Sequence, residues 1–241
     1  MRKIKLSLIL PCFNEAEHII QSVSRIISQL KSMPMNYELI FVEDKSTDDT
    51  PKLLKEIKKK YNQTPIQIIW QSKNQGRGFA LSTGIKHAKG KIVGYIDIDL
   101  EIAPSYIPAC AKKIEQGFDV VCGWRTYDFA LDSLARWLAS NCYRLLTRFV
   151  LHHSLHDTES GYKFFSRSAI LPLLPKIHDR HWFWDTEVML LSQRAGLKIY
   201  ELKMKFIRRK DKTSTVKLLP DTWEYLKQLW KFRSRLTKVS L

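Results

Sequence analysis

The sequence lacks several features that would place it in other protein classes. No uncharged apolar run reaches the roughly 18 residues that a membrane-spanning helix needs, so none is predicted. The N-terminus lacks the pattern of a cleavable signal peptide, from which we expect a cytoplasmic protein. No C-x-x-C pair, internal repeat or low-complexity linker is present, which predicts no structural zinc and one main domain. The thiols of Cys12, Cys110, Cys122 and Cys142 are expected to be reduced.

Acidic residues are scarce relative to basic ones. The 241 residues include 40 lysines and arginines against 24 aspartates and glutamates, a formal net charge of +16. This excess favours an anionic partner: nucleic acid, an anionic membrane surface or a phosphorylated substrate. No segment resembles a nucleic-acid-binding motif, and the basic residues are not interleaved with aromatic residues as a stacking platform. We therefore expect no nucleic-acid partner.

The sequence does contain a regular alternation of strand and helix patterns through its first half. This alternation predicts an α/β fold with a mostly parallel sheet covered by helices on both faces. The predicted strands are 4–10, 38–43, 66–71, 92–98 and 119–123, and the predicted helices are 15–31, 50–60, 77–88 and 104–116. The second half is less regular, with helices predicted at about 131–151, 185–195 and 219–236 and a strand at 198–207.

Polar clusters follow the first four predicted strands. The most informative is Asp97-Ile98-Asp99, because unpaired carboxylates are costly to bury and residues two apart on a strand share a face. A divalent cation usually relieves such a cluster, and hard oxygen ligands suit Mg²⁺ or Mn²⁺, although loop chemistry without a metal is the alternative. Because ligands of parallel α/β sheets bind outside the carboxyl ends of the strands, the four clusters together predict a binding site.

The other clusters have structural interpretations beside the functional one. Asn14 and Glu15 stand where they would cap the following helix, and Ser46 to Asp48 are ordinary capping residues too. Gly76 and Gly78 permit close approach of an anion to the backbone, with Arg77 adding positive charge. This segment is not a dinucleotide fingerprint, because Leu81 occupies the third glycine position.

Taken in order, these motifs resemble those of the family 2 glycosyltransferases with the GT-A fold. The matching segments are Leu10-Pro11-Cys12-Phe13-Asn14-Glu15, Val42-Glu43-Asp44-Lys45-Ser46-Thr47-Asp48, Asn74-Gln75-Gly76-Arg77-Gly78-Phe79-Ala80 and Asp97-Ile98-Asp99-Leu100-Glu101. The resemblance implies that Asp97 and Asp99 hold Mg²⁺ or Mn²⁺ on the donor diphosphate, with Glu101 able to complete the coordination. The residues that it implies for binding the nucleotide sugar are Pro11, Asn14, Glu15, Glu43, Asp44, Gly76, Arg77 and Asp97.

Later motifs look like those of the polyprenyl-phosphate mannosyl and glucosyl synthases. They are Gly117 to Arg125, Asp157-Thr158-Glu159-Ser160-Gly161-Tyr162-Lys163-Phe164-Phe165, Trp184-Asp185-Thr186-Glu187, and Arg209 followed by Ser214. The sequence departs from the family's common residues at Glu43, Lys45, Trp124 and Thr215, where aspartate, glycine, serine and lysine are usual. The resemblance extends to about Val216, from which we expect a catalytic domain over 1–216. The spacing of Trp223, Leu226 and Trp230 among basic residues predicts a basic amphipathic helix over 217–241.

The implied reaction is an inverting transfer of mannose or glucose from a GDP- or UDP-linked donor to a polyprenyl or dolichyl phosphate. The implied catalytic residues are Asp99, Arg125 and Arg209, and Arg209 would clamp donor or acceptor phosphates. The residues implied for the acceptor phosphate are Arg125, Arg136, Ser140 and Ser214. Arg136 and Ser140 lie four residues apart on one helix face, as a shared contact requires. The alternative for each arginine is a solvated surface charge.

Two further questions stay open in the sequence. A lipid phosphate is already an anion and needs no strong base, whereas transfer to a hydroxyl of a glycolipid or polysaccharide needs one. Asp157, Asp185 and Glu187 are the candidates for that base, or they hold Lys163 and arginines in ion pairs.

The helices at 131–151 and 219–236 have two interpretations. Either they lie at a membrane surface, directly or through an anchoring partner, or they pack on the domain. The Gly161-Tyr162-Lys163-Phe164-Phe165 segment leans toward the glucosyl synthases.

Overall fold

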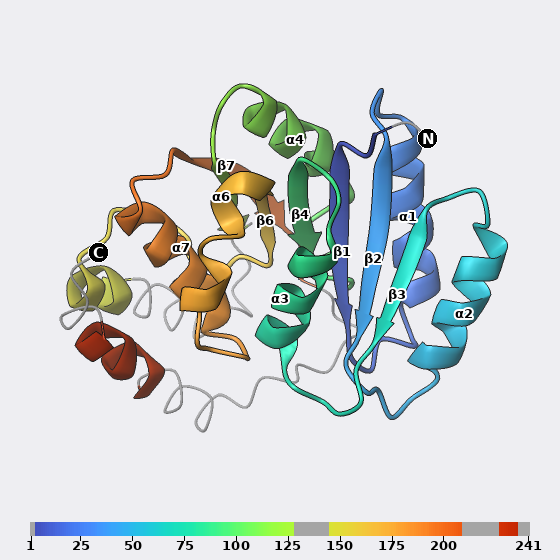
Figure 1. Cartoon of the computed structure of the whole chain (residues 1–241), viewed down its shortest axis with the longest axis horizontal. Helices are drawn as coiled ribbons and strands as arrows, with labels where there is room; N and C mark the ends of the chain where they lie inside the picture. The colour runs from blue at the N-terminus through green and yellow to red at the C-terminus, as the bar shows by residue number, and fades with distance from the viewer. Residues whose placement is uncertain (1–2, 128–144, 209–226, 236–241) are drawn as a thin grey trace.

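The computed structural model describes residues 3–127, 145–208 and 227–235. Figure 1 shows the arrangement of its elements. In chain order these are β1 (Leu6–Cys12), α1 (Ile19–Lys31), β2 (Tyr37–Glu43), α2 (Thr50–Lys60), β3 (Ile66–Trp70), α3 (Arg77–His87), β4 (Ile92–Ile96), η1 (Pro104–Tyr106), α4 (Ile107–Glu115), β5 (Val120–Tyr127), β6 (Tyr162–Ser166), α6 (Arg167–Ile170), η3 (Leu174–Lys176), α7 (Trp184–Arg194) and β7 (Ile199–Phe206). Residues 145–151 and 227–235 are also helical.

The strands form one sheet in the order β3-β2-β1-β4-β6-β5-β7. All neighbouring pairs are parallel except those of β6, which runs antiparallel to both β4 and β5. The register pairs Ile96 with Tyr162, so the carboxyl end of β4 meets the amino end of β6. The ends of the first four strands and the beginning of β6 therefore lie along one edge of the sheet.

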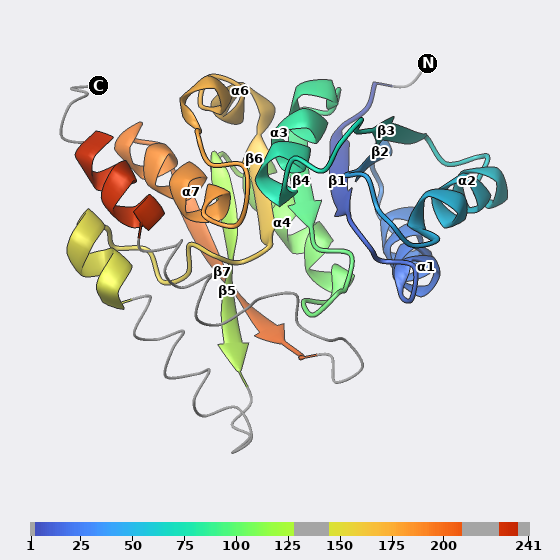
Figure 2. The ribbon, with the colours of Figure 1, turned by 90° about the horizontal axis from the view of Figure 1, so that it is seen from below.

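Helices cover both faces of this sheet, as Figures 1 and 2 show. One face packs on α1, α2 and α4 through residues such as Leu8 and Leu10, and the other packs on α3, α6 and α7 through residues such as Ile9. This alternation along β1 is the pleat of a strand that is buried on both sides. The predicted mostly parallel sheet with helices on both faces is confirmed.

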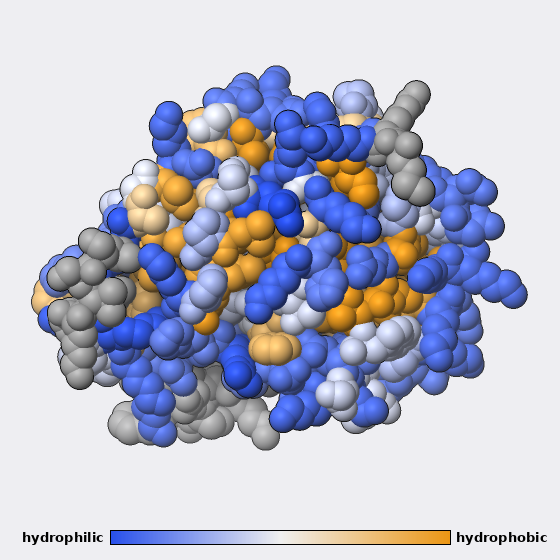
Figure 3. Space-filling view, viewed as in Figure 1, coloured by the Kyte–Doolittle hydropathy of each residue, from blue (hydrophilic) through white to orange (hydrophobic). Residues whose placement is uncertain are grey.

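The helical residues 145–151 and 227–235 lie beside α7 (Figures 1 and 2). Val150 and Leu229 are buried there, whereas Phe149 and Trp230 are exposed by 78% and 56%. The part of the chain that the structure describes has no helix long and apolar enough to cross a membrane. The face in Figure 3 is largely hydrophilic, with hydrophobic residues visible around α3 and α7.

Several boundaries differ from the predictions. Helix α2 matches its predicted range, but α1 begins at Ile19 because residues 16–18 form a turn. Strand β4 ends at Ile96, where its pairing with β6 ends, so the prediction of a strand through residue 98 is wrong. Asp97 and Asp99 consequently lie in the turn that follows, and the argument that they share a strand face does not apply. Strand β6 was not predicted.

Candidate active site

The loops after β1 and β2 are joined by side-chain hydrogen bonds to backbone groups. Asn14, at φ 56°, accepts a bond from the Thr47 N–H through Oδ1 at 2.8 Å, and its own N–H donates to Ser46 Oγ at 3.0 Å. The Glu15 N–H donates to Thr50 Oγ1 at 2.8 Å. Asn14 therefore does not cap α1, whose N-cap is His18 without a side-chain bond. It fixes one loop against the other.

Asp44 ties the loop after β2 to the loop after β3. Its two carboxylate oxygens accept the N–H groups of Gln75 and Gly76 at 2.9 and 2.8 Å. Burial raises the pKa of Asp44, and these two backbone bonds partly counteract it. Gly76 has φ 95°, and a Cβ there would lie 2.4 Å from both the Arg180 carbonyl oxygen and His181 Nδ1. Only glycine fits this crossing of two loops.

Glu43 shapes its own turn. Its buried carboxylate accepts the N–H groups of Lys45 and Ser46. Lys45 has φ 63°, a left-handed conformation that glycine adopts more readily than lysine. The predicted contacts of Glu43, Asp44, Glu15 and Pro11 with a nucleotide stay predictions, but all four residues lie at the same edge of the sheet.

Asp97 lies where this edge meets β6. Its Oδ1 accepts bonds from Nε and Nη2 of Arg77 at 2.9 and 2.7 Å, and its N–H donates to the Gly161 carbonyl at 3.1 Å. A Cβ on Gly161 would stand 1.7 Å from Asp97 Oδ2, so only glycine leaves that oxygen open. Burial raises the pKa of Asp97, Asp99 and Asp185 raise it further, and Arg77 opposes them.

The fit of a metal rests on the chemistry of this turn. The residues in the described ranges include no ready-made group of three or more metal-binding side chains. Asp97, Asp99 and Glu101 are nevertheless partly exposed carboxylates, and the absence of a side chain at Gly161 keeps Asp97 Oδ2 accessible. Mg²⁺ commonly takes one or two protein carboxylates and completes its shell with phosphates and water. The carboxylate oxygens of Asp97, Asp99 and Glu101 fit such a cation.

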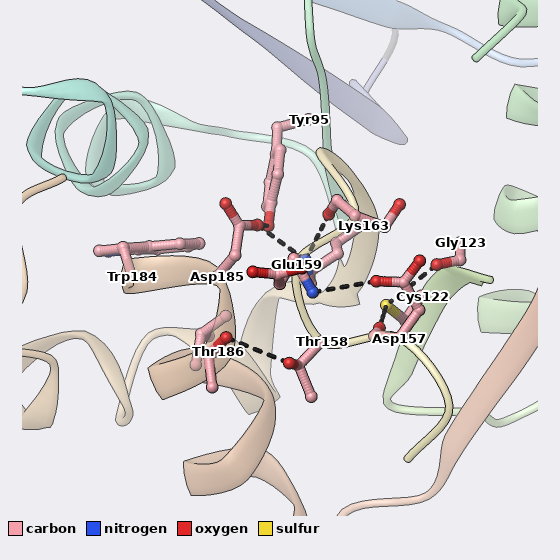
Figure 4. A network of polar contacts seen from close by, with 12 residues as sticks. Tyr95, Cys122, Gly123, Asp157, Thr158, Glu159, Lys163, Trp184, Asp185 and Thr186 are labelled. Atoms are coloured by element: carbon pink, nitrogen blue, oxygen red, sulfur yellow. Dashed lines mark hydrogen bonds and ion pairs between the residues drawn. The ribbon is translucent and has the colours of Figure 1, made fainter. Parts of the chain in front are cut away.

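Arg77 connects Asp97 to a buried ionic network around Asp185, and Figure 4 shows the Tyr95, Lys163 and Asp185 side chains of this network. Asp185 on α7 accepts hydrogen bonds from Arg77, from the Tyr95 hydroxyl and, at 2.7 Å, from Lys163 Nζ. Lys163, on β6, is fully buried. Although burial raises the pKa of Asp185, the cations of Arg77 and Lys163 outweigh it and lower the pKa below its ordinary value. Asp185 is therefore an ionised anchor and is poorly suited to act as a general base.

A second ion pair holds Arg125. Nε and Nη2 of Arg125, on β5, donate to the two oxygens of the fully buried Asp157 at 2.7 and 2.9 Å. Burial lowers the pKa of Arg125, but Asp157 outweighs it and raises the pKa well above its ordinary value. The neighbouring Trp124 stacks on His156, with the ring centroids 4.0 Å apart. The other predicted phosphate contacts, namely Arg136, Ser140, Arg209 and Ser214, lie outside the described residues.

The irregular segment 177–183 lies over the beginning of α3. The Trp182 ring centroid is 5.6 Å from the Arg77 guanidinium carbon, and the Trp182 side chain is 42% exposed. Glu187 holds the segment by accepting the N–H groups of His178 and Asp179 at 3.1 and 2.8 Å, and it also pairs with Arg235.

Sequence reasoning missed Tyr95, His181 and Trp182 and gave Gly161 no role of its own, whereas the predicted ion pairing of Lys163 with one of the acids is confirmed by its contact with Asp185. Lys163 offered a signal, because a lysine between aromatic residues in a strand-like run needs a buried partner.

The sequence of this chain is similar to those of known proteins. The profile of the family described as Glycosyl transferase family 2 matches residues 7–173. Glycosyltransferase AglD of Haloferax volcanii is 31% identical over 203 residues, which cover 82% of this chain and 32% of that protein. The dolichyl-phosphate beta-glucosyltransferase of Saccharomyces cerevisiae is 30% identical over 220 residues, covering 83% of this chain and 66% of that protein. The chain thus spans about a third of one relative and just under two thirds of the other.

Solved structures show the same fold. Glucosyl-3-phosphoglycerate synthase from Mycobacterium tuberculosis in complex with uridine diphosphate superposes with a TM-score of 0.65 at 24% identity, covering 96% of this chain and 80% of that one. A complex of the same enzyme with Mn²⁺, UDP-glucose and phosphoglyceric acid gives a TM-score of 0.65 at 23% identity, covering 94% and 77% of the two chains.

Proposed function

The chain belongs to glycosyl transferase family 2 and has an α/β fold of the GT-A type, and on this premise we propose that it transfers a hexose from a nucleotide sugar to a polyprenyl or dolichyl phosphate. The beta-glucosyltransferase names of the yeast relative and of one from Dictyostelium discoideum favour glucose, and UDP in the structural neighbours favours UDP-glucose as the donor. GDP-mannose is the second donor to test.

The nucleoside of the donor would bind to the loops after β1, β2 and β3. Asn14 and Asp44 fix these loops to one another. The diphosphate then lies near Arg77 and the turn of Asp97 and Asp99. A divalent cation held by these two aspartates, with Glu101 as a further ligand, would neutralise charge on the departing diphosphate.

The ion pairing of the three acidic residues in the second half of the chain favours a phosphate acceptor. Asp185 is paired with Arg77 and Lys163, Asp157 with Arg125, and Glu187 with Arg235. Each of these buried carboxylates is committed to an ion pair, which disfavours a role as general base. A phosphate acceptor needs none, because it arrives as an anion and attacks the anomeric carbon directly. The reaction requires positive charge instead, which Arg125 and the predicted Arg136 and Arg209 would supply, with hydroxyl hydrogen-bond donors from the predicted Ser140 and Ser214.

A lipid acceptor requires contact with a membrane, and we propose that the helical residues 145–151 and 227–235 lie on its surface. Leu145, Phe149 and Trp230 are exposed by 65%, 78% and 56%, and the basic side chains around them would meet anionic headgroups. Flotation with vesicles that contain anionic lipid should recover the protein, whereas failure to float in every composition would argue for an anchoring partner or a soluble acceptor.

One assay tests the function. The purified protein is incubated with UDP-glucose or GDP-mannose, Mn²⁺ or Mg²⁺, and a polyprenyl phosphate, and the lipid fraction is analysed for a glycosyl phosphate. We expect a glucosylated lipid phosphate that requires the divalent cation. Transfer only to a hydroxyl acceptor would overturn the proposed acceptor, and absence of transfer from every donor would overturn the proposed reaction.

A further inference from the structure

We propose that the helical residues 227–235 position the segment 177–183 over the donor site, with Arg235 and Phe232 as the positioning residues. The assignment of this segment to a nucleotide-sugar donor rests on the proposed function. The positioning of residues 177–183 by residues 227–235 rests only on the contacts described below.

The first contact is hydrophobic. Phe232 is 2% exposed and meets Phe183 edge to face, with the ring centroids 5.8 Å apart at an interplanar angle of 68°. Leu229 is fully buried in the same cluster, which also contains Trp184 and Val188 of α7. Phe183 ends the irregular segment and directly precedes α7. Residues 227–235 are therefore packed against the point where this segment enters its helix.

The second contact is ionic and reaches the middle of the segment. Arg235 pairs with Glu187, whose side chain is 2% exposed. Glu187 also accepts the N–H groups of His178 and Asp179. Asp179 Oδ1 in turn accepts the N–H groups of His181 and Trp184 at 2.7 and 3.0 Å. Two carboxylates thus hold four backbone groups, and Arg235 balances the charge of the first carboxylate.

The far side of the segment faces the donor site. The Arg180 carbonyl accepts the N–H of Phe79 at 3.0 Å, in the first turn of α3. His181 lies against Gly76, and Trp182 contacts Arg77. Residues 177–183 form no helix or strand, so side-chain contacts largely fix their conformation. Loss of a contact from residues 227–235 should therefore loosen the segment while leaving the sheet unaffected.

Hydrogen exchange tests the link without any substrate. We expect Arg235→Ala to speed exchange at the backbone amides of residues 178–184 about tenfold, the effect of losing one charge-assisted hydrogen bond. Amides of β1 and β4 should exchange as in the parent protein. Lys231→Ala is the matched control, because it removes the same charge from the exposed side of the same helical segment. Arg235→Lys should restore most of the protection.

A kinetic measurement extends the test to the donor. The same Arg235→Ala change should raise KM for the nucleotide sugar several-fold with a smaller change in kcat, since it disturbs residues beside Arg77 and leaves Asp97 and Asp99 in place. Unchanged exchange at residues 178–184 would overturn the link, and so would faster exchange spread evenly over the sheet. Altered exchange in a protein that turns over no nucleotide sugar would leave the link standing and overturn the proposed function instead.

Discussion

The two halves of the site are held together by different chemistry. In the first half, made by the loops after β1, β2, β3 and β4, side chains such as those of Asn14 and Asp44 accept backbone N–H groups. In the half built on β6, α7 and β5, buried ions pair with one another, as Lys163 with Asp185 and Arg125 with Asp157. Arg77 belongs to the first half by position and to the second by its partner Asp185.

This difference predicts different sensitivities. A hydrogen bond to the backbone contributes about 1 kcal/mol, and its loss is local. A buried charge that loses its partner costs about 3–5 kcal/mol, because the remaining ion is stranded. Single substitutions in the first half should therefore change the free energy of unfolding little and reduce mainly the catalytic activity. Substitutions that break an ion pair in the second half should lower the free energy of unfolding.

The largest effect is expected from Asp99→Ala in the first half. Loss of a proposed metal ligand should lower kcat by roughly 10³-fold or more, since a bound cation contributes several kcal/mol to stabilising the departing diphosphate. The melting temperature should change little, because Asp99 lies in a partly exposed turn. Turnover is measured beside Glu56→Ala, an exposed change on α2. Metal-dependent turnover equal to that of the control would contradict the metal site.

Lys163→Met tests the second half. We expect the free energy of unfolding in urea to fall by about 3 kcal/mol, because Asp185 keeps a buried charge with one cation fewer. Lys86→Met on the exposed side of α3 serves as the control and should change it by less than about 0.5 kcal/mol. Equal losses in the two variants would break the distinction between the halves.

Acid should also lower stability through His153, which follows the helical residues 145–151. His153 is buried, neither of its ring nitrogens has a hydrogen-bond partner among the residues that the structure describes, and burial followed by the Arg148 cation lowers its pKa to about 4. The unfolded chain therefore binds a proton more readily than the folded one between pH 6.5 and 4, so stability is complete above this window and declines as pH falls through it. His153→Leu should flatten this decline by about 2 kcal/mol in urea titrations at pH 7 and pH 4.5. An unchanged pH dependence would show that other groups cause it.

The smallest effect is expected at Asn14. Asn14→Gly keeps the left-handed backbone and loses the bonds that Asn14 Oδ1 accepts from the Thr47 N–H and hydroxyl, which should lower the free energy of unfolding by about 1 kcal/mol. Asn14→Ala should cost more, because its Cβ disfavours φ 56°. If urea denaturation finds Asn14→Gly as damaging as Lys163→Met, the proposed contrast between the halves is wrong.

The first half of the site was predictable because its information is local. Each polar cluster directly follows an apolar strand, and parallel strands bring their carboxyl ends to one edge. The sequence thus predicted that residues 12–15, 43–46, 72–75 and 97–101 would gather, and the positions of Asn14, Asp44, Gln75 and Asp97 agree. It did not predict that Asp44 would use both oxygens on backbone groups, because that depends on how two loops cross.

The second half depends on partners that are distant in sequence. Lys163 can be buried because Asp185, 22 residues later, and the Ser160 carbonyl accept hydrogen bonds from its ammonium group, and the pattern of β6 alone does not reveal that Asp185 is the charged partner. Glu187 was ambiguous for the same reason, since its contacts include Arg235, 48 residues away. The end of β4 at Ile96 likewise follows from its pairing with β6 rather than from its own residues.

The insertion of β6 between β4 and β5 also determines when the sheet can close during synthesis. Strands β1 to β4 complete a parallel unit by residue 96, but one side of β4 stays unpaired until the ribosome has delivered residue 166. The unpaired edge of β4 can pair with other chains while synthesis continues. Its pairing with β6 is a slow step because the two strands are distant in sequence. Because Gly161 packs against Asp97 where β4 meets β6, the surroundings of the Asp97 carboxylate are complete only after β6 has paired. A chain truncated before residue 162 would therefore leave Asp97 without these surroundings and keep an edge that promotes aggregation.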